Sequence, residues 1–115
     1  MEQDPEGYIK NQLPLTETTY FIMLSLATGK KHGYRIMKDV KNISDGRLTL
    51  GTGTLYGALG RLLEYGWIKR VDEKQEMGRP RNAYTLSDLG LRILSAETER
   101  LQSVVSVAKL RLADL

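Results

Sequence analysis

Residues 51–64 carry three glycines on one side of a predicted helix, and this feature constrains the fold most strongly. Leu55, Leu59 and Leu62 recur at helical spacing and form an apolar stripe, which Leu63 widens. Each exposed glycine costs a helix roughly 0.5–1 kcal/mol relative to alanine. At 100° per residue, the side opposite the leucines holds these residues: Gly53, Gly57, Gly60, Arg61 and Glu64.

Two interpretations of the glycine face, defined as Gly53, Gly57 and Gly60, are open. The helix is either a poor helix former that the fold tolerates, or a helix whose outer side must approach another backbone closely. A helix laid in a DNA groove needs such close approach together with side chains that hydrogen-bond. The second interpretation predicts these DNA contacts: Thr52, Gly53, Thr54, Tyr56, Gly57 and Arg61.

Positive charge is concentrated on the segment that contains this helix. Residues 30–81 hold twelve Lys or Arg against six Asp or Glu, whereas the rest of the 115-residue chain holds five against eight. A surface that binds a polyanion requires such a concentration. The chain has no cysteine, which excludes a disulfide scaffold and thiolate zinc sites. With no predicted signal peptide or membrane span, we expect a cytoplasmic protein.

Two helices are predicted before the glycine-faced one. Thr16 is the expected N-cap of the first, which is apolar almost all round up to Gly29, so we expect its own domain and a second subunit to bury it. The second spans roughly Gly33 to Ser44. A basic strip at helical spacing consists of Lys31, Arg35, Lys38 and Lys41. This strip is either a solvated face or a phosphate-binding surface. His32, the lone histidine, is expected to cap or pack rather than to catalyse or bind metal.

A β-hairpin is predicted after the glycine-faced helix. Residues 67–71 and 82–86 are rich in β-forming residues, and Gly78 and Pro80 mark a turn between them. The tip presents Arg79 and Arg81 on an extended backbone, which suits a narrow and strongly negative minor groove. An ordinary basic hairpin that contacts only solvent is the alternative.

A long helix is predicted from Ser87 or Asp88 to the C-terminus. Its apolar positions follow a 3-4 spacing with one polar interruption, which predicts a coiled-coil-like seam with a second copy of the chain. The seam comprises Leu91, Leu94, Thr98, Leu101, Val105, Ala108 and Leu112. We expect Tyr20 and Leu24 of the first helix to join this dimer interface. Residues 1–14 show little periodicity and are predicted to be an irregular arm.

Several motifs occur together in one order: His32-Gly33-Tyr34, Gly53-Thr54-Leu55-Tyr56 with Arg61-Leu62, Gly66-Trp67-Ile68, and Gly78-Arg79-Pro80-Arg81 with Tyr84, Ser87 and Gly90. This set, over about residues 13–112, resembles the PadR family of bacterial transcriptional regulators, in its short form with one C-terminal helix. The resemblance implies a winged helix-turn-helix homodimer, usually a repressor, that often responds to phenolic acids, drugs or other small molecules. It adds Tyr34 and Tyr84 to the expected DNA-binding residues.

Three positions depart from the family pattern. Gly60, Asn82 and Thr85 stand where the family commonly has basic residues, which implies weaker or more salt-sensitive DNA binding. The dimerisation helix lacks the tryptophan of the drug-binding members, and we expect Trp67, the sole tryptophan, to pack in the core.

The predicted fold is mainly α with a small β-hairpin. Residues 1–14 form an arm, 15–86 a winged helix-turn-helix DNA-binding domain and 87–115 a dimerisation helix. The predicted function is a homodimeric repressor that binds a palindromic operator in double-stranded DNA and is released by a small aromatic or drug-like effector. Candidate effector residues, chosen for apolarity and helix membership, are Phe21, Met23, Ile93 and Val104.

Two other classes of protein compete with this function. The alternative is a winged-helix protein-interaction module that binds no DNA, because this fold does not dictate nucleic-acid binding. An enzyme is disfavoured because the chain has no cysteine nucleophile, one histidine and no glycine-rich phosphate loop after a buried strand. We therefore expect no catalytic residues, no metal, no cofactor and no membrane partner.

Overall fold

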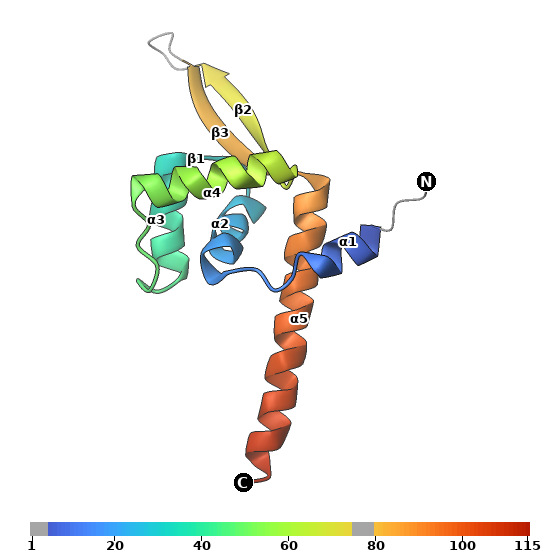
Figure 1. The fold of residues 1–115 in the computed structure, drawn as a ribbon. Helices are drawn as coiled ribbons and strands as arrows, with labels where there is room; N and C mark the ends of the chain where they lie inside the picture. Colours follow the sequence, from blue (N-terminus) through green and yellow to red (C-terminus); the bar gives the residue numbers. More distant parts are fainter. Residues whose placement is uncertain (1–4, 75–79) are drawn as a thin grey trace.

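The structure is a computed structural model that describes residues 5–74 and 80–115, of which 72–74, 80 and 81 are described by their backbone (Figure 1). It is mainly helical with a small antiparallel sheet, which confirms the predicted fold class. The helices are α1 (Pro5–Asn11), α2 (Glu17–Ala27), α3 (Gly33–Ile43), α4 (Thr52–Tyr65) and α5 (Asp88–Ala113). The strands are β1 (Lys31–His32), β2 (Ile68–Lys74) and β3 (Pro80–Leu86).

The helix ends lie close to where the sequence predicts them, because their capping residues act locally. Thr16 Oγ1 accepts a hydrogen bond from Thr19 N at the start of α2, and Ser87 Oγ accepts one from Gly90 N at the start of α5. Gly66 ends α4 in the left-handed conformation, with φ 76°.

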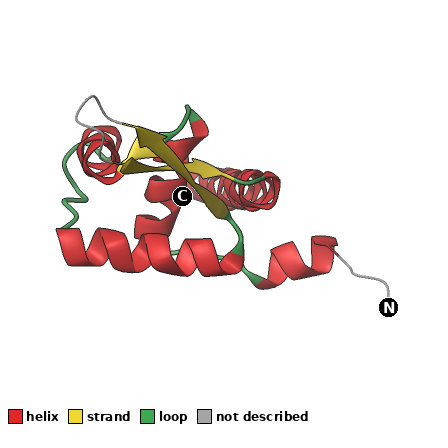
Figure 2. Ribbon diagram, turned by 90° about the horizontal axis from the view of Figure 1, so that it is seen from above, coloured by secondary structure: helices red, strands yellow, loops and turns green. Residues whose placement is uncertain are grey.

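The sheet has three strands in the order β1-β3-β2. The predicted hairpin forms β2 and β3, with Ile68 opposite Leu86 and Arg70 opposite Tyr84. The sequence does not predict the third strand, β1, which is two residues long. It pairs with the edge of β3 that does not face β2, and Lys31 lies opposite Tyr84. Seen from above in Figure 2, the strands cross between two helices viewed nearly end-on, while α4 runs along one side.

The core lies where α2, α3 and α4 meet the sheet and the start of α5. Its fully buried side chains include Ile22, Ile36, Leu55 and Ile93, one from each of these four helices. Trp67 is buried as predicted, and its Nε1 donates a hydrogen bond to Tyr8 Oη at 3.2 Å.

Residues 5–11 form a helix where the sequence predicts an irregular arm. Ile9 is buried in the core cluster, and α1 packs against α5. The segment is short and includes Pro5 and Gly7, so its own periodicity is too weak to predict a helix. Contact with the rest of the domain stabilises it instead.

The long helix α5 divides into two parts. Ile93, Leu94 and Glu97 in its first half are buried against the domain, whereas residues 101–115 are all exposed. Figure 1 shows the second half extending away from the other elements. The expectation that Leu94 forms part of a dimer seam is therefore wrong, because its side chain packs inside its own domain.

Candidate nucleic-acid interface

The glycine face of α4 is on the surface of the molecule. Leu55, Leu59 and Leu62 are buried, whereas Gly53, Gly57 and Gly60 are all exposed. A Cβ atom added at Gly53 or Gly60 would meet nothing within 4 Å, and one at Gly57 would lie 3.7 Å from Arg61 Nη1. No contact within the described residues therefore requires glycine at these three positions. The smooth surface suits a body that approaches α4 from outside.

Polar side chains surround this smooth surface. Thr52, Thr54 and Arg61 are exposed on α4, at the positions that the sequence predicts. Gly51 begins the helix without a side-chain cap, and the N-terminal end of a helix favours negative charge. The exposed face of α4 thus combines hydrogen-bond donors with close access to the backbone.

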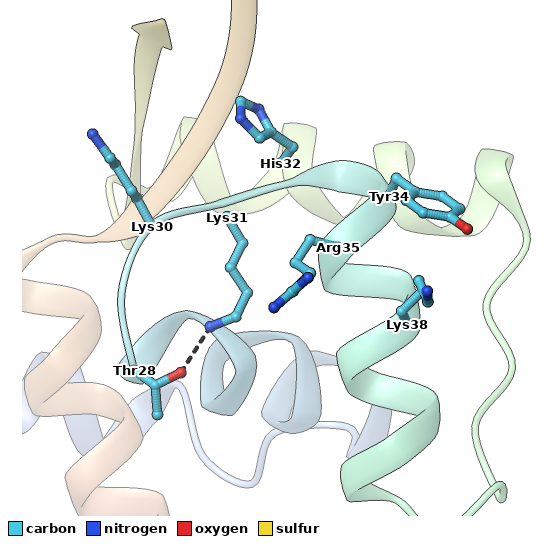
Figure 3. A pocket seen from close by; sticks show the side chains of 7 residues that line it. All are labelled: Thr28, Lys30, Lys31, His32, Tyr34, Arg35 and Lys38. Atoms are coloured by element: carbon cyan, nitrogen blue, oxygen red, sulfur yellow. Dashed lines mark hydrogen bonds between the residues drawn. The ribbon is translucent and has the colours of Figure 1, made fainter.

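A basic hollow of about 600 Å³ lies where the end of α2 meets β1 and the start of α3, and it is defined here by its lining residues (Figure 3). It is lined by Thr28, Lys30, Lys31, His32, Tyr34, Arg35 and Lys38. In Figure 3 the Arg35 side chain points back toward Lys31, while Tyr34 and Lys38 lie together on the outer side of α3. Lys38 Nζ is 5.5 Å from the centroid of the Tyr34 ring, a cation–π distance.

Lys31 differs from the other lysines of the predicted basic strip. Its side chain is only 14% exposed, and its ammonium donates hydrogen bonds to Ser25 O and to Thr28 Oγ1, with Asp39 Oδ2 at 3.9 Å. Lys31 therefore joins the end of α2 to β1 and α3. The expected phosphate contact is not what this geometry favours, whereas Arg35 and Lys38 are exposed as predicted.

Three lining residues of the hollow were absent from the predicted contacts: Thr28, Lys30 and His32. The available signal was the Lys30-Lys31-His32 run before α3. Lys31 matches the spacing of the helical strip but begins a strand, so helical periodicity does not reveal this run as a lining of the hollow. The histidine precedes α3 as expected, and its Nδ1 lies 3.1 Å from Asn82 O.

Tyr84 and Tyr56, both predicted to contact DNA, have different environments. Tyr84 is 5% exposed, and burial followed by the neighbouring Tyr56 raises the pKa of its phenol against the lowering influence of Arg70. Tyr84 is thus a core residue, and this burial argues against the expected direct contact with DNA. Tyr56 is about half exposed, and its hydroxyl lies against Gly33, where an added Cβ atom would overlap with it. Tyr56 therefore connects α4 to the start of α3.

The wing is described only in part. Its two strands run antiparallel from Ile68–Leu86 to Lys74–Pro80, and Lys69 and Arg70 are exposed on β2. Arg79, at the predicted tip, lies outside the described residues, and only the backbone position of Arg81 in β3 is described.

Two of the four candidate effector residues are in the core. Met23 and Ile93 have no exposed surface, so they cannot line a site between subunits as expected. Helical membership and apolarity do not distinguish a core residue from an interface residue. Val104 is half exposed, and Phe21 is partly buried with its ring edge-on to Tyr20 at 6.0 Å.

Most of the predicted dimer residues on α5 are exposed. Leu101, Val105, Ala108 and Leu112 stay within one arc of the helix, together with Val104. Leu91 is 52% exposed and lines a groove between α1 and α5, and Tyr20 and Leu24 are partly buried. We define the α5 stripe as Leu101, Val104, Val105, Ala108 and Leu112.

Neither metal chemistry nor a membrane span is indicated in the described part of the chain. Within residues 5–74 and 80–115, no group of three His, Asp or Glu side chains is arranged to hold a metal ion. None of the helices in these ranges combines the length and apolarity needed to cross a membrane.

Comparison with known proteins gives three kinds of match. A family model described as the transcriptional regulator PadR-like family matches residues 22–96. An uncharacterized 37.1 kDa protein in transposon TN4556 of Streptomyces fradiae is 37% identical over 76 residues, which cover 66% of this chain and 20% of that protein. The chain thus spans about a fifth of this relative.

Two of the solved structures that resemble this fold are described as PadR regulators. A PadR family transcription regulator from Clostridium difficile R20291 has a TM-score of 0.72 at 24% identity, covering 84% of this chain and 99% of that one. PadR of Bacillus subtilis, solved in complex with operator DNA, has a TM-score of 0.64 at 25% identity, covering 70% of this chain and 46% of that one.

Proposed function

The chain belongs to the PadR-like family of transcriptional regulators, which are DNA-binding proteins rather than enzymes, and we propose that it is a homodimeric repressor of a palindromic operator. The observation that carries the proposal is the exposed glycine face of α4, which no contact within the described residues explains. The similar PadR of Bacillus subtilis was solved with operator DNA, which supports assigning a DNA partner here.

In the proposed complex α4 enters the major groove as the recognition helix. The glycine face lets its backbone approach the base edges, where Thr54 and Arg61 stand on the exposed side. An arginine that reaches the edge of a guanine forms two hydrogen bonds, which distinguish that base from the others. Arg61 is therefore the proposed main determinant of sequence preference.

Phosphate contacts are assigned to exposed residues of α3 that line the basic hollow. Arg35 and Lys38 are exposed there, and Tyr34 presents its ring next to Lys38. Charges in these places strengthen binding to every DNA sequence and make it depend on salt. Lys31 is not assigned a phosphate, since its ammonium already binds Ser25 O and Thr28 Oγ1.

The α5 stripe is the proposed dimer contact. Its apolar side chains are exposed on a helix that extends beyond the domain, so water is excluded from them only if another surface covers them. A second copy of α5 offers the same stripe, and a two-fold axis pairs the two. Two recognition helices related by this axis would read half-sites about 10 base pairs apart, or a multiple of that.

A small aromatic effector that releases the repressor completes the proposal. With Met23 and Ile93 assigned to the core, Phe21 and Val104 are the remaining candidates for a site between the subunits. Binding there would change how the two copies of α5 meet, and therefore how the recognition helices are spaced.

The test of this proposal is selection of bound DNA from a random library at physiological salt, with the oligomeric state measured in parallel. A DNA-binding dimer selects a palindromic consensus. A protein-interaction module, the alternative function, selects no consensus under these conditions, and that result would contradict the proposal.

A further inference from the structure

A buried carboxylate joins α5 to the start of α2. Glu97 is 1% exposed, and its Oε2 accepts a hydrogen bond from Leu15 N at 2.7 Å. The two carboxylate oxygens also accept hydrogen bonds from Arg100: Oε1 from Nε at 2.5 Å, and Oε2 from Nη2 at 3.2 Å. Leu15 directly precedes Thr16, the N-cap of α2. Glu97 therefore connects α5 to a helix that contributes buried residues to the core.

Stability alone does not explain a charged residue at this place. Removing a carboxylate from water is costly, and an apolar side chain of similar volume often serves a buried position as well or better. Hydrogen bonds, however, have preferred directions, whereas apolar contacts do not. What Glu97 adds to packing is therefore a defined orientation of α5 relative to the domain.

A second polar contact reinforces the first. Tyr20 Oη on α2 lies 2.7 Å from Thr98 Oγ1 on α5. Beyond Arg100, every residue of α5 is exposed. The contacts at Glu97 and Thr98 thus stand just before the half of α5 that extends away from the domain in Figure 1.

Small changes of orientation at this place have large effects further along α5. A helix rises about 1.5 Å per residue, so a tilt of about 10° at Glu97 moves Leu112 by roughly 4 Å. The rise of one base pair in DNA is about 3.4 Å. A tilt of this size would therefore displace the end of α5 relative to its domain by about the rise of one base pair.

We propose that Glu97 is a positioning residue that fixes the angle of α5 and thereby sets the half-site spacing that the dimer accepts. This inference rests on the proposed function, because it requires a homodimer that binds two half-sites. It goes further by assigning spacing preference to a side chain that contacts neither DNA nor the α5 stripe.

The experiment uses operators with fixed half-sites whose separation changes by one base pair at a time over one helical turn. Wild type should prefer one separation. Glu97→Ala should stay dimeric and prefer the same half-site bases. Its preference for the best separation over neighbouring ones should fall roughly fivefold, which corresponds to about 1 kcal/mol. Glu97→Gln keeps an oxygen for Leu15 N and should fall less. Glu99→Ala, which removes an exposed carboxylate from the same helix, should match wild type.

A merely structural role predicts a different result. Loss of folded protein would lower the apparent affinity of Glu97→Ala by the same factor for every operator. The spacing preference would then be unchanged, and this result would overturn the inference. If Glu97→Ala does not fold, Tyr20→Phe carries the same prediction through the Thr98 contact, and an unchanged spacing preference there overturns it as well. Failure of the proposed function is recognised separately, because wild type itself would then be monomeric or bind no operator.

Discussion

Gly90 on α5 packs directly against the backbone carbonyl of Trp67, at a separation that leaves no room for a Cβ atom. Because the atom it would meet belongs to the backbone, a side chain at this position must shift α5 or the start of β2. Gly60 is the opposite case, with open space around the position of its missing Cβ. Two glycines of this chain are therefore present for different reasons.

The first prediction compares these two positions. Gly90→Ala should lower the free energy of unfolding by about 1–3 kcal/mol, because it overpacks a close contact. Gly60→Ala should raise it by roughly 0.5–1 kcal/mol, since alanine favours the helix. Urea denaturation of both variants measures the difference. Equal stability of Gly90→Ala and wild type would show that α5 can move away from Trp67 at no cost.

The second prediction separates an internal lysine from an exposed one. Lys31→Gln should reduce stability, because Ser25 O and Thr28 Oγ1 lose their charged donor. Lys38→Gln should leave stability unchanged but lower the slope of log affinity against log salt by roughly one. Thermal unfolding and DNA titrations at several salt concentrations provide both quantities. The assignment is wrong if Lys31→Gln changes the salt slope and Lys38→Gln does not.

The third prediction concerns acid. Burial raises the pKa of the Glu97 carboxyl, but the hydrogen bonds from Arg100 and Leu15 N and the charge of Arg100 outweigh burial, so the pKa lies below its ordinary value of 4.5. A carboxyl with a lowered pKa in the folded state stabilises the protein above the pKa of the unfolded state. This contribution is lost as pH falls through the lower, folded-state pKa.

Glu97→Gln cannot titrate, so its stability should fall less steeply than that of wild type as pH decreases below about 4.5. Urea denaturation at several pH values gives the two curves, and their difference isolates Glu97 because the other carboxylates are shared. Parallel curves across this range would show that Glu97 ionises equally in the folded and unfolded chains.

The sequence predicts the outward direction of the glycine face because helical periodicity assigns each residue of α4 to a side. Periodicity does not say what covers that side. Leu94 and Leu101 belong to one repeating pattern, yet the first is buried in its own domain and the second is exposed. The border between them depends on where α1 and α2 end against α5, which only the folded chain defines.

Long-range pairing explains the remaining differences. Lys31 fits a helical strip with Arg35, but it lies in β1 opposite Tyr84, 53 positions along the chain. This pairing turns Lys31 inward and buries Tyr84, and neither effect has a local sequence signal. The Glu97–Leu15 hydrogen bond joins residues 82 positions apart, so local sequence patterns do not predict the orientation of α5 either.

The fourth prediction tests the α5 stripe. Leu101→Glu would place a charge in the proposed dimer contact and should yield a folded monomer at micromolar concentration. Leu110→Glu is the matched control, because Leu110 is exposed on the opposite side of the same helix and should remain dimeric. Sedimentation velocity distinguishes the two states. Monomeric wild type, or a monomer produced only by Leu110→Glu, would contradict the assigned stripe.

The operator affinity of Gly57→Leu, compared with that of Gln102→Leu on the exposed half of α5, tests most directly whether the glycine face of α4 lies against DNA. Leucine at position 57 should stabilise the helix by roughly 0.5–1 kcal/mol. Its bulk should also hold α4 away from the groove. We expect Gly57→Leu to be a folded dimer with a normal or raised melting temperature that no longer binds its operator, while Gln102→Leu binds normally. Operator binding by Gly57→Leu at wild-type affinity would show that the glycine face does not lie against DNA.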